Sequence, residues 1–86
     1  MELKFGDKVT WKSQAGGKET RKQGEIVYIL LRTENPYNSF PFIDDYQIMF
    51  DYPTRFRNHE SYLVKVENGK KQPKLYWPLV KYLVKI

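Results

Sequence analysis

The chain has 86 residues, which is enough for one hydrophobic core and too few for two. It contains no cysteine, which excludes disulfides, thiolate metal sites and cysteine nucleophiles and fits a reducing compartment. Fifteen Lys and Arg against ten Asp and Glu give a net charge of +5, a mild preference for anionic partners. The longest apolar run, residues 26–31, is too short to span a membrane, and the N-terminus lacks a signal peptide's apolar core. We therefore expect a cytoplasmic protein without membrane contact.

The first third of the chain predicts two strands joined by a polar segment. Residues 7–11 alternate, with Val9 and Trp11 on one face, as in a half-buried strand. Residues 13–24 are polar, contain glycines and show no helical stripe, which indicates a long loop or a loose hairpin. Residues 25–32 are apolar on both faces and β-branched, which predicts a central strand.

Residues 33–57 predict an irregular insertion between the central strands. Pro36 and Pro41 exclude an ordinary helix or a central strand there. Residues 46–50 nevertheless have the composition of a short strand. The insertion also holds an unusual concentration of rings, with seven Tyr and Phe residues between positions 37 and 56.

The last third of the chain predicts a hairpin and a closing strand. Residues 61–67 alternate, Asn68-Gly69 is a hairpin signal, and residues 75–77 form the return strand. Residues 78–81 suit one 3₁₀ turn before a final strand at residues 83–86. We expect a core made of Val9, Trp11, Ile26, Val27, Ile29, Leu31, Tyr62, Val64, Val66, Leu75, Trp77, Leu79, Val80 and Val84.

Short strands without a convincing helix predict an all-β fold, a small five-stranded SH3-like barrel that occupies residues 1–86 as a single domain. A family resemblance points the same way. It is carried by residues 5–17 (FGDKVTWKSQAGG), 58–64 (NHESYLV) and 75–78 (LYWP). These segments resemble a group of small bacterial and phage proteins and, more distantly, the Tudor-like domain named for hypervirulence-associated proteins. The resemblance implies an SH3-like barrel and a phage or mobile-element origin, but transfers no catalytic or binding residue.

Two basic clusters are candidate nucleic-acid contacts. The first is the segment 12–22, whose glycines would make it a mobile phosphate-contacting loop; its cations are Lys12, Lys18, Arg21 and Lys22. A solvated hairpin is the alternative. In the second cluster Arg55 and Arg57 flank Phe56, an interleaving that suits single strands because Arg meets phosphate and the ring meets a base.

The aromatic insertion has three interpretations. Its rings pack on the barrel or form a homodimer contact, or they bind a protein partner, or they stack on bases. Asp44, Asp45 and Asp51 lie among the rings and would repel phosphates, which favours protein contact or packing. The partner-binding candidates are Tyr37, Phe40, Phe42, Tyr52 and Phe56, with Tyr76, which alternation turns away from the core.

No catalytic site is predicted. His59 is the single histidine, and its neighbours Glu60 and Ser61 point to alternate faces if they lie on a strand. We therefore expect a non-enzymatic binding module with no catalytic residues, no metal and no cofactor. Two functions remain open: weak binding of nucleic acid through the basic loop, or protein interaction or inhibition, of phage origin, through the aromatic insertion.

Overall fold

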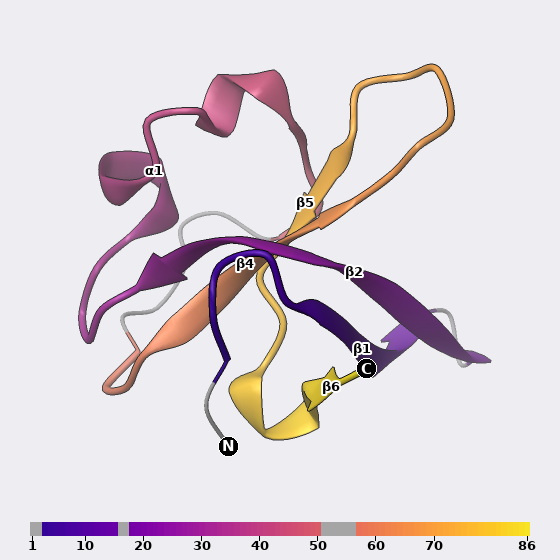
Figure 1. Ribbon diagram of the computed structural model, residues 1–86, viewed down its shortest axis with the longest axis horizontal. Helices are drawn as coiled ribbons and strands as arrows, with labels where there is room; N and C mark the ends of the chain where they lie inside the picture. The colour runs from indigo at the N-terminus through magenta and orange to yellow at the C-terminus, as the bar shows by residue number, and fades with distance from the viewer. Residues whose placement is uncertain (1–2, 16–17, 51–56) are drawn as a thin grey trace.

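The computed structural model describes residues 3–15, 18–50 and 57–86, which are mostly strands in one mixed sheet (Figure 1). The strand order is β3-β5-β4-β2-β1-β6, and every pair is antiparallel except β3 with β5. The strands are β1 (Lys8–Ala15), β2 (Lys18–Leu30), β3 (Gln47–Ile48), β4 (Ser61–Val66), β5 (Lys74–Tyr76) and β6 (Val84–Lys85). The expected all-β class is confirmed. The sheet is open, with β3 and β6 as its edges, so the described strands do not close into a barrel.

The segment expected to be a polar loop is mostly strand. β1 and β2 pair continuously from Lys8 with Glu25 to Ala15 with Lys18, which makes residues 8–15 and 18–25 a two-stranded ribbon. The described part of the segment is therefore paired strand, as in the hairpin alternative, rather than a long loop. The cause is cross-strand pairing, which lets a polar ribbon form without an apolar stripe of its own.

β2 serves two partners and bends between them. Its first part pairs with β1, and from Glu25 onward it pairs with β4. The register with β4 shifts between Ile26 and Tyr28, so Val27 is an extra residue in the ladder. Because a bulge reverses the alternation, Ile26 and Ile29 pack on one face of the sheet, whereas Leu30 packs on the other. Both faces of this strand are covered, as its composition predicts.

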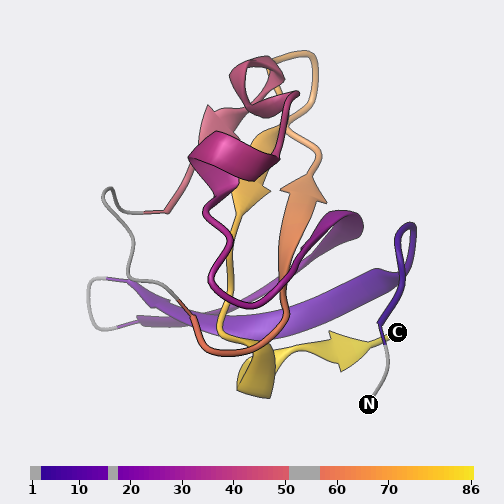
Figure 2. The same cartoon turned by 90° about the vertical axis from the view of Figure 1, so that its left-hand side faces the viewer.

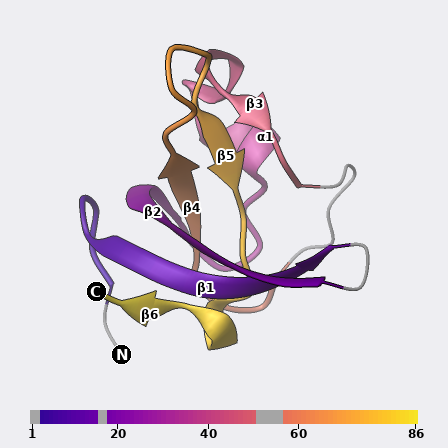
Figure 3. The same cartoon turned by 90° about the vertical axis from the view of Figure 1, so that its right-hand side faces the viewer.

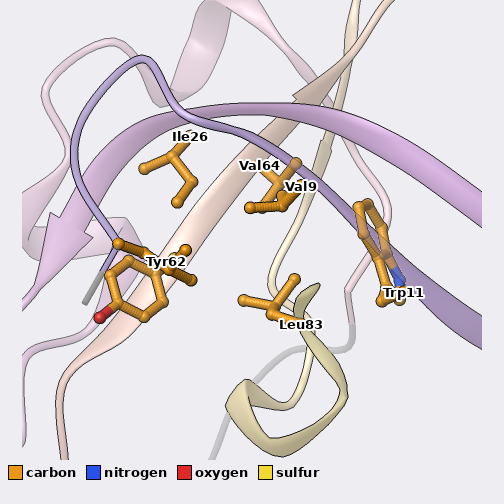
Figure 4. Close-up of a cluster of buried hydrophobic side chains, with 7 residues drawn as sticks. Val9, Trp11, Ile26, Tyr62, Val64 and Leu83 are labelled. Carbon is orange, nitrogen blue, oxygen red and sulfur yellow. The ribbon is translucent and has the colours of Figure 1, made fainter. Parts of the chain in front are cut away.

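The first hydrophobic cluster lies between β1, β4 and the C-terminal segment (Figure 4). Leu83 points from the chain just before β6 toward Val9 and Trp11. The cluster comprises Leu3, Val9, Trp11, Ile26, Tyr62, Val64 and Leu83, all at most 7% exposed. It ties the two ends of the chain to the central strands.

The second hydrophobic cluster lies on the other face of β4 and β5, under the insertion (Figure 2). Its buried members are Leu30, Phe40, Leu63, Leu75 and Trp77. The covering segment contains α1 (Pro36–Ser39) and η1 (Ile43–Asp45). α1 is a single turn that begins at Pro36, where a missing N–H does no harm, and Asn35 Oδ1 caps it by accepting from the Tyr37 N–H at 2.8 Å.

Several core expectations were wrong. Leu31, Leu79 and Val84 are exposed by 59%, 49% and 54%, and burial of Val27, Ile29, Val66 and Val80 is only partial. The sequence analysis missed five buried apolar residues: Leu3, Leu30, Phe40, Leu63 and Leu83. Trp77 is buried in the second cluster, whereas Val64 pairs with Tyr76 and is buried in the first.

The C-terminal elements follow the expectation closely. η2 (Val80–Tyr82) is the 3₁₀ turn expected before the last strand, although it begins two residues later than expected, and β6 returns to pair with β1. β3 confirms the short strand within the insertion. None of the helices in the three described ranges is long and apolar enough to cross a membrane.

Candidate nucleic-acid interface

The two faces of the β1–β2 ribbon carry different cations. Residues directly opposite in an antiparallel pair share a face, and Lys12 lies opposite Arg21, whereas Trp11 lies opposite Lys22. Lys12 and Arg21 are exposed, but Lys22 Nζ sits 5.2 Å from the centroid of the Tyr76 ring on the core side. The predicted basic set is therefore divided between the two faces of the ribbon. Lys12 and Arg21 lie together on the exposed face, and Lys22 packs on an aromatic ring on the other face. Lys18 begins β2, and its side chain is outside the described part.

The exposed face of the ribbon meets η2 and β6 in a groove. β6 lies along β1 because Val84 pairs with Thr10, and η2 immediately precedes it (Figure 3). The groove has a volume of about 220 Å³ and is lined by Trp11, Lys12, Arg21, Lys81, Tyr82 and Val84. It therefore joins the predicted cations of the ribbon to a cation and a ring from the other end of the chain.

The groove has a positive field. Three cations line it, and none of the carboxylates that the structure describes does. Lys12 Nζ lies 3.3 Å from Glu19 Oε1, but both side chains are more than half exposed, so this ion pair contributes only about 0.2–1 kcal/mol. A phosphate oxygen can therefore replace the carboxylate at little loss.

Arg21 keeps most of its hydrogen-bonding capacity. Its Nη1 donates to Thr10 Oγ1 at 3.3 Å, and the Thr10 hydroxyl in turn donates to the Lys22 carbonyl at 2.7 Å. A guanidinium has five N–H donors, and this exposed side chain uses one of them within the described ranges. The contact with Thr10 orients the guanidinium while leaving donors for a ligand.

Tyr82 is the aromatic component of the groove. Its side chain is 51% exposed, and the Lys81 ammonium lies 5.1 Å from its ring centroid. Neither residue was predicted as a contact, because Lys81 fell in the expected structural turn at 78–81 and Tyr82 lay between that turn and the expected closing strand. The sequence signal that could have identified them is the expected closing strand, because a last strand that pairs with the first brings the turn before it next to the ribbon.

Of the second basic cluster the structure describes one residue, Arg57, and its side chain is partly buried. The Arg57 guanidinium donates to the carbonyls of Trp77 at 2.9 Å and Pro78 at 2.8 Å. Burial lowers its pKa, and its charge is directed into the protein. Arg57 therefore stabilises the fold through these two hydrogen bonds. The other two members, Arg55 and Phe56, lie outside the described residues.

The partner-binding candidates are likewise split. Phe40 is 4% exposed in the second cluster, so its ring is not available to a partner; the packing interpretation applies to it. Tyr37 stacks edge-on with Phe50 at 5.7 Å, whereas Phe42 is 62% exposed. Tyr76, expected to face away from the core, is partly buried beside Trp11, 5.5 Å between ring centroids. Tyr52 lies outside the described residues.

The histidine region has a local structural role. The His59 side chain is exposed, with Nδ1 2.8 Å from the Glu60 carbonyl oxygen. Ser61 is buried, and its Oγ accepts the indole N–H of Trp77 at 2.8 Å. In the part of the chain that the structure describes, no three His, Asp or Glu side chains gather in a way that could hold a metal ion.

A larger hollow of about 470 Å³, between the start of β1 and the end of β4, lacks such a field. Its charges are paired: Lys8 with Glu25 at 3.2 Å and Lys65 with Glu67 at 3.1 Å. The hydrogen bond that the Lys65 ammonium donates to the Glu67 carboxylate, and the negative charge of that carboxylate, raise the pKa of Lys65. No family model, curated protein or solved structure matches the chain.

Proposed function

We propose that this protein is a non-enzymatic nucleic-acid-binding module whose phosphate contacts lie in the groove between the β1–β2 ribbon and η2. The observation that carries the proposal is the convergence of Lys12, Arg21 and Lys81 on one groove, which no carboxylate of the described ranges lines. Phosphate contacts of this kind dominate the affinity of proteins for nucleic acid. The proposed contact surface keeps Lys12 and Arg21 from the predicted set and adds Lys81.

The pairing of like charges supports an anionic ligand. Lys12 lies directly opposite Arg21 in the ribbon, an arrangement that destabilises an antiparallel pair. Glu19 relieves it in part through its ion pair with Lys12. A bound phosphate between the two cations would relieve it further, so the free ribbon is suited to an anion.

We also propose that the fold is an open variant of the SH3-like, Tudor-like barrel suggested by the resemblance. Two features support this. β2 bends at its bulge so that it pairs with β1 on one side and β4 on the other. A 3₁₀ turn then precedes the last strand, which returns to the first. Small barrels of this kind are mostly binding modules, in keeping with the proposed activity.

The test is the salt dependence of binding to mixed-sequence oligonucleotides, measured by fluorescence anisotropy. Three lining cations predict a log–log slope of about −2 to −3, since each neutralised phosphate contributes roughly 0.7–0.9. We expect weak binding. Replacing Arg21 and Lys81 together by Gln should flatten the slope by about 1.5–2 units.

The control is the pair Lys70→Gln with Lys71→Gln, which makes the same change in net charge. Both lysines are exposed in the β4–β5 hairpin loop, at the end of the molecule opposite η2 and β6 (Figure 3). This variant should keep most of the wild-type slope. If both variants lost the same part of the salt slope, binding would depend on net charge alone and not on the groove. Absence of binding in roughly 50 mM salt would refute the proposal.

One observation favours a second function, contact with a protein partner or a second copy through the insertion. Phe42 is 62% exposed, at 6.1 Å from the buried Phe40 ring, so it extends the aromatic cluster to the surface. Light scattering tests self-association directly. A wild-type dimer that Phe42→Asp converts to a folded monomer would support this function, and a wild-type monomer at high concentration would remove the homodimer.

A further inference from the structure

Tyr82 is the feature of the groove that phosphate binding leaves unused. A solvent-exposed ring among three cations is unnecessary for contact with phosphates, which need only positive charge and N–H donors. Most rings of the described chain pack against one another, as Phe40 does with Tyr28 at 5.2 Å. The exposure of Tyr82 therefore calls for a ligand with an aromatic or apolar face.

The ring is presented from a fixed position. η2 is closed by hydrogen bonds from the Tyr82 N–H to the Leu79 carbonyl and from the Leu83 N–H to the Val80 carbonyl, both 3.0 Å. Leu83, the next residue, is 2% exposed in the first hydrophobic cluster and anchors the turn (Figure 4). Because the ring is already held in place, binding of a stacking partner does not have to order a loop.

The residues around the Tyr82 ring suit both parts of a nucleotide, the anionic phosphate and the flat base. Arg21 and Lys12 lie across the groove from η2, and Lys81 contacts the ring itself. Val84, 54% exposed, adds an apolar surface beside the ring. A chain of nucleotides has this same alternation of anionic phosphates and flat apolar bases.

From this arrangement we infer that the groove binds single-stranded nucleic acid, with one base stacked on Tyr82 and the neighbouring phosphates on Arg21, Lys12 and Lys81. The inference rests on the proposed function and narrows its ligand. In a duplex the faces of the bases are covered by their neighbours in the stack, so only an unpaired strand can offer a face to the ring. Duplexes would be held by phosphate contacts alone.

The experiment compares two single strands of equal length, one carrying bases and one abasic, which have the same number of phosphates. We expect the wild-type protein to bind the strand with bases about 5- to 100-fold more tightly, the range for one stacked base. Tyr82→Ala should bind both strands at the affinity of the abasic one, with the salt slope unchanged. Tyr82→Phe should keep the preference, because the ring does the stacking.

Controls separate this inference from the proposed function. Phe42→Ala removes an exposed ring far along the chain from the groove and should keep the wild-type preference. Equal, salt-dependent binding of both strands by the wild type would overturn the stacking and leave the phosphate contacts standing. Loss of the preference in Tyr82→Phe would also overturn it, in favour of a hydrogen bond from the hydroxyl. If neither strand binds at low salt, the proposed function fails and the inference with it.

Discussion

The guanidinium carbon of Arg57 lies over the indole of Trp77, 3.9 Å from the ring centroid, and the same group donates to the carbonyl oxygens of Trp77 and Pro78. This single side chain joins the segment before β4 to the chain that leaves β5. A planar, permanently charged group with donors in a fork can make the stack and both hydrogen bonds at once, which an ammonium cannot. A residue that reads as a phosphate contact in the sequence is thus a structural one.

Arg57→Lys should therefore destabilise the protein while leaving nucleic-acid binding intact. The substitution keeps the charge but loses the stacked plane and the forked hydrogen bonds, and we expect the free energy of unfolding to fall by about 1–3 kcal/mol. Urea denaturation measures the loss. The salt slope of binding should not change. Unchanged stability together with weakened binding would return Arg57 to the interface.

Trp77 and Ser61 form the second testable pair. The buried indole N–H donates to the buried Ser61 Oγ at 2.8 Å, so removing either partner leaves a polar group unsatisfied in the second cluster. Trp77→Ala should lose roughly 3–5 kcal/mol, mostly from lost packing. In a double-mutant cycle of Trp77→Phe and Ser61→Ala, we expect a coupling of about 0.5–3 kcal/mol by denaturant melts. Strictly additive losses would mean that the hydrogen bond adds nothing.

The positions of most strands along the chain were predictable because local patterns mark them. Alternation located β1 and β4, Asn68-Gly69 located the hairpin to β5, and the apolar run located β2. The faces of the strands were not predictable in the same way. One extra residue at Val27 exchanges the two faces for the rest of β2, and no local preference marks that position. Leu31 was therefore assigned to the core in place of Leu30.

The residues of the candidate site were likewise only partly predictable from the sequence. Lys12 and Arg21 were visible as part of a basic segment, but their separation from Lys22 depends on a register that only cross-strand pairing sets. Tyr82 and Lys81 join them through a tertiary contact between the two ends of the chain. Charge counting finds which cations exist, and the register of the ribbon decides which of them act together.

Gly24 marks the place where the ribbon crosses β4. A Cβ at this position would meet the backbone carbonyl oxygen of Lys65 and lie 2.8 Å from Val64 Cγ1, so the backbone itself would have to move. Gly24→Ala should lower the free energy of unfolding by about 1–3 kcal/mol, as overpacking does, although alanine is otherwise better than glycine in a strand. The neighbouring exposed position supplies the control: Gln23→Ala should change stability by less than about 0.5 kcal/mol in the same urea melts. A stabilised Gly24→Ala would show that the crossing is looser than described.

Phe40 and Phe42 should respond oppositely to the same substitution, although they are two residues apart in one aromatic segment. Phe40 is 4% exposed and its ring contacts those of Tyr28 and Tyr46, whereas Phe42 is 62% exposed. An aspartate at position 40 would place an unpaired charge among apolar side chains, and we expect loss of the folded near-ultraviolet circular dichroism signal at neutral pH. Phe42→Asp should keep that signal and unfold within about 0.5–1 kcal/mol of the wild type. Because Phe40→Asp cannot report on association, the self-contact has to be tested with Phe42→Asp alone. A folded Phe40→Asp variant would mean that the insertion does not cover the second cluster in solution.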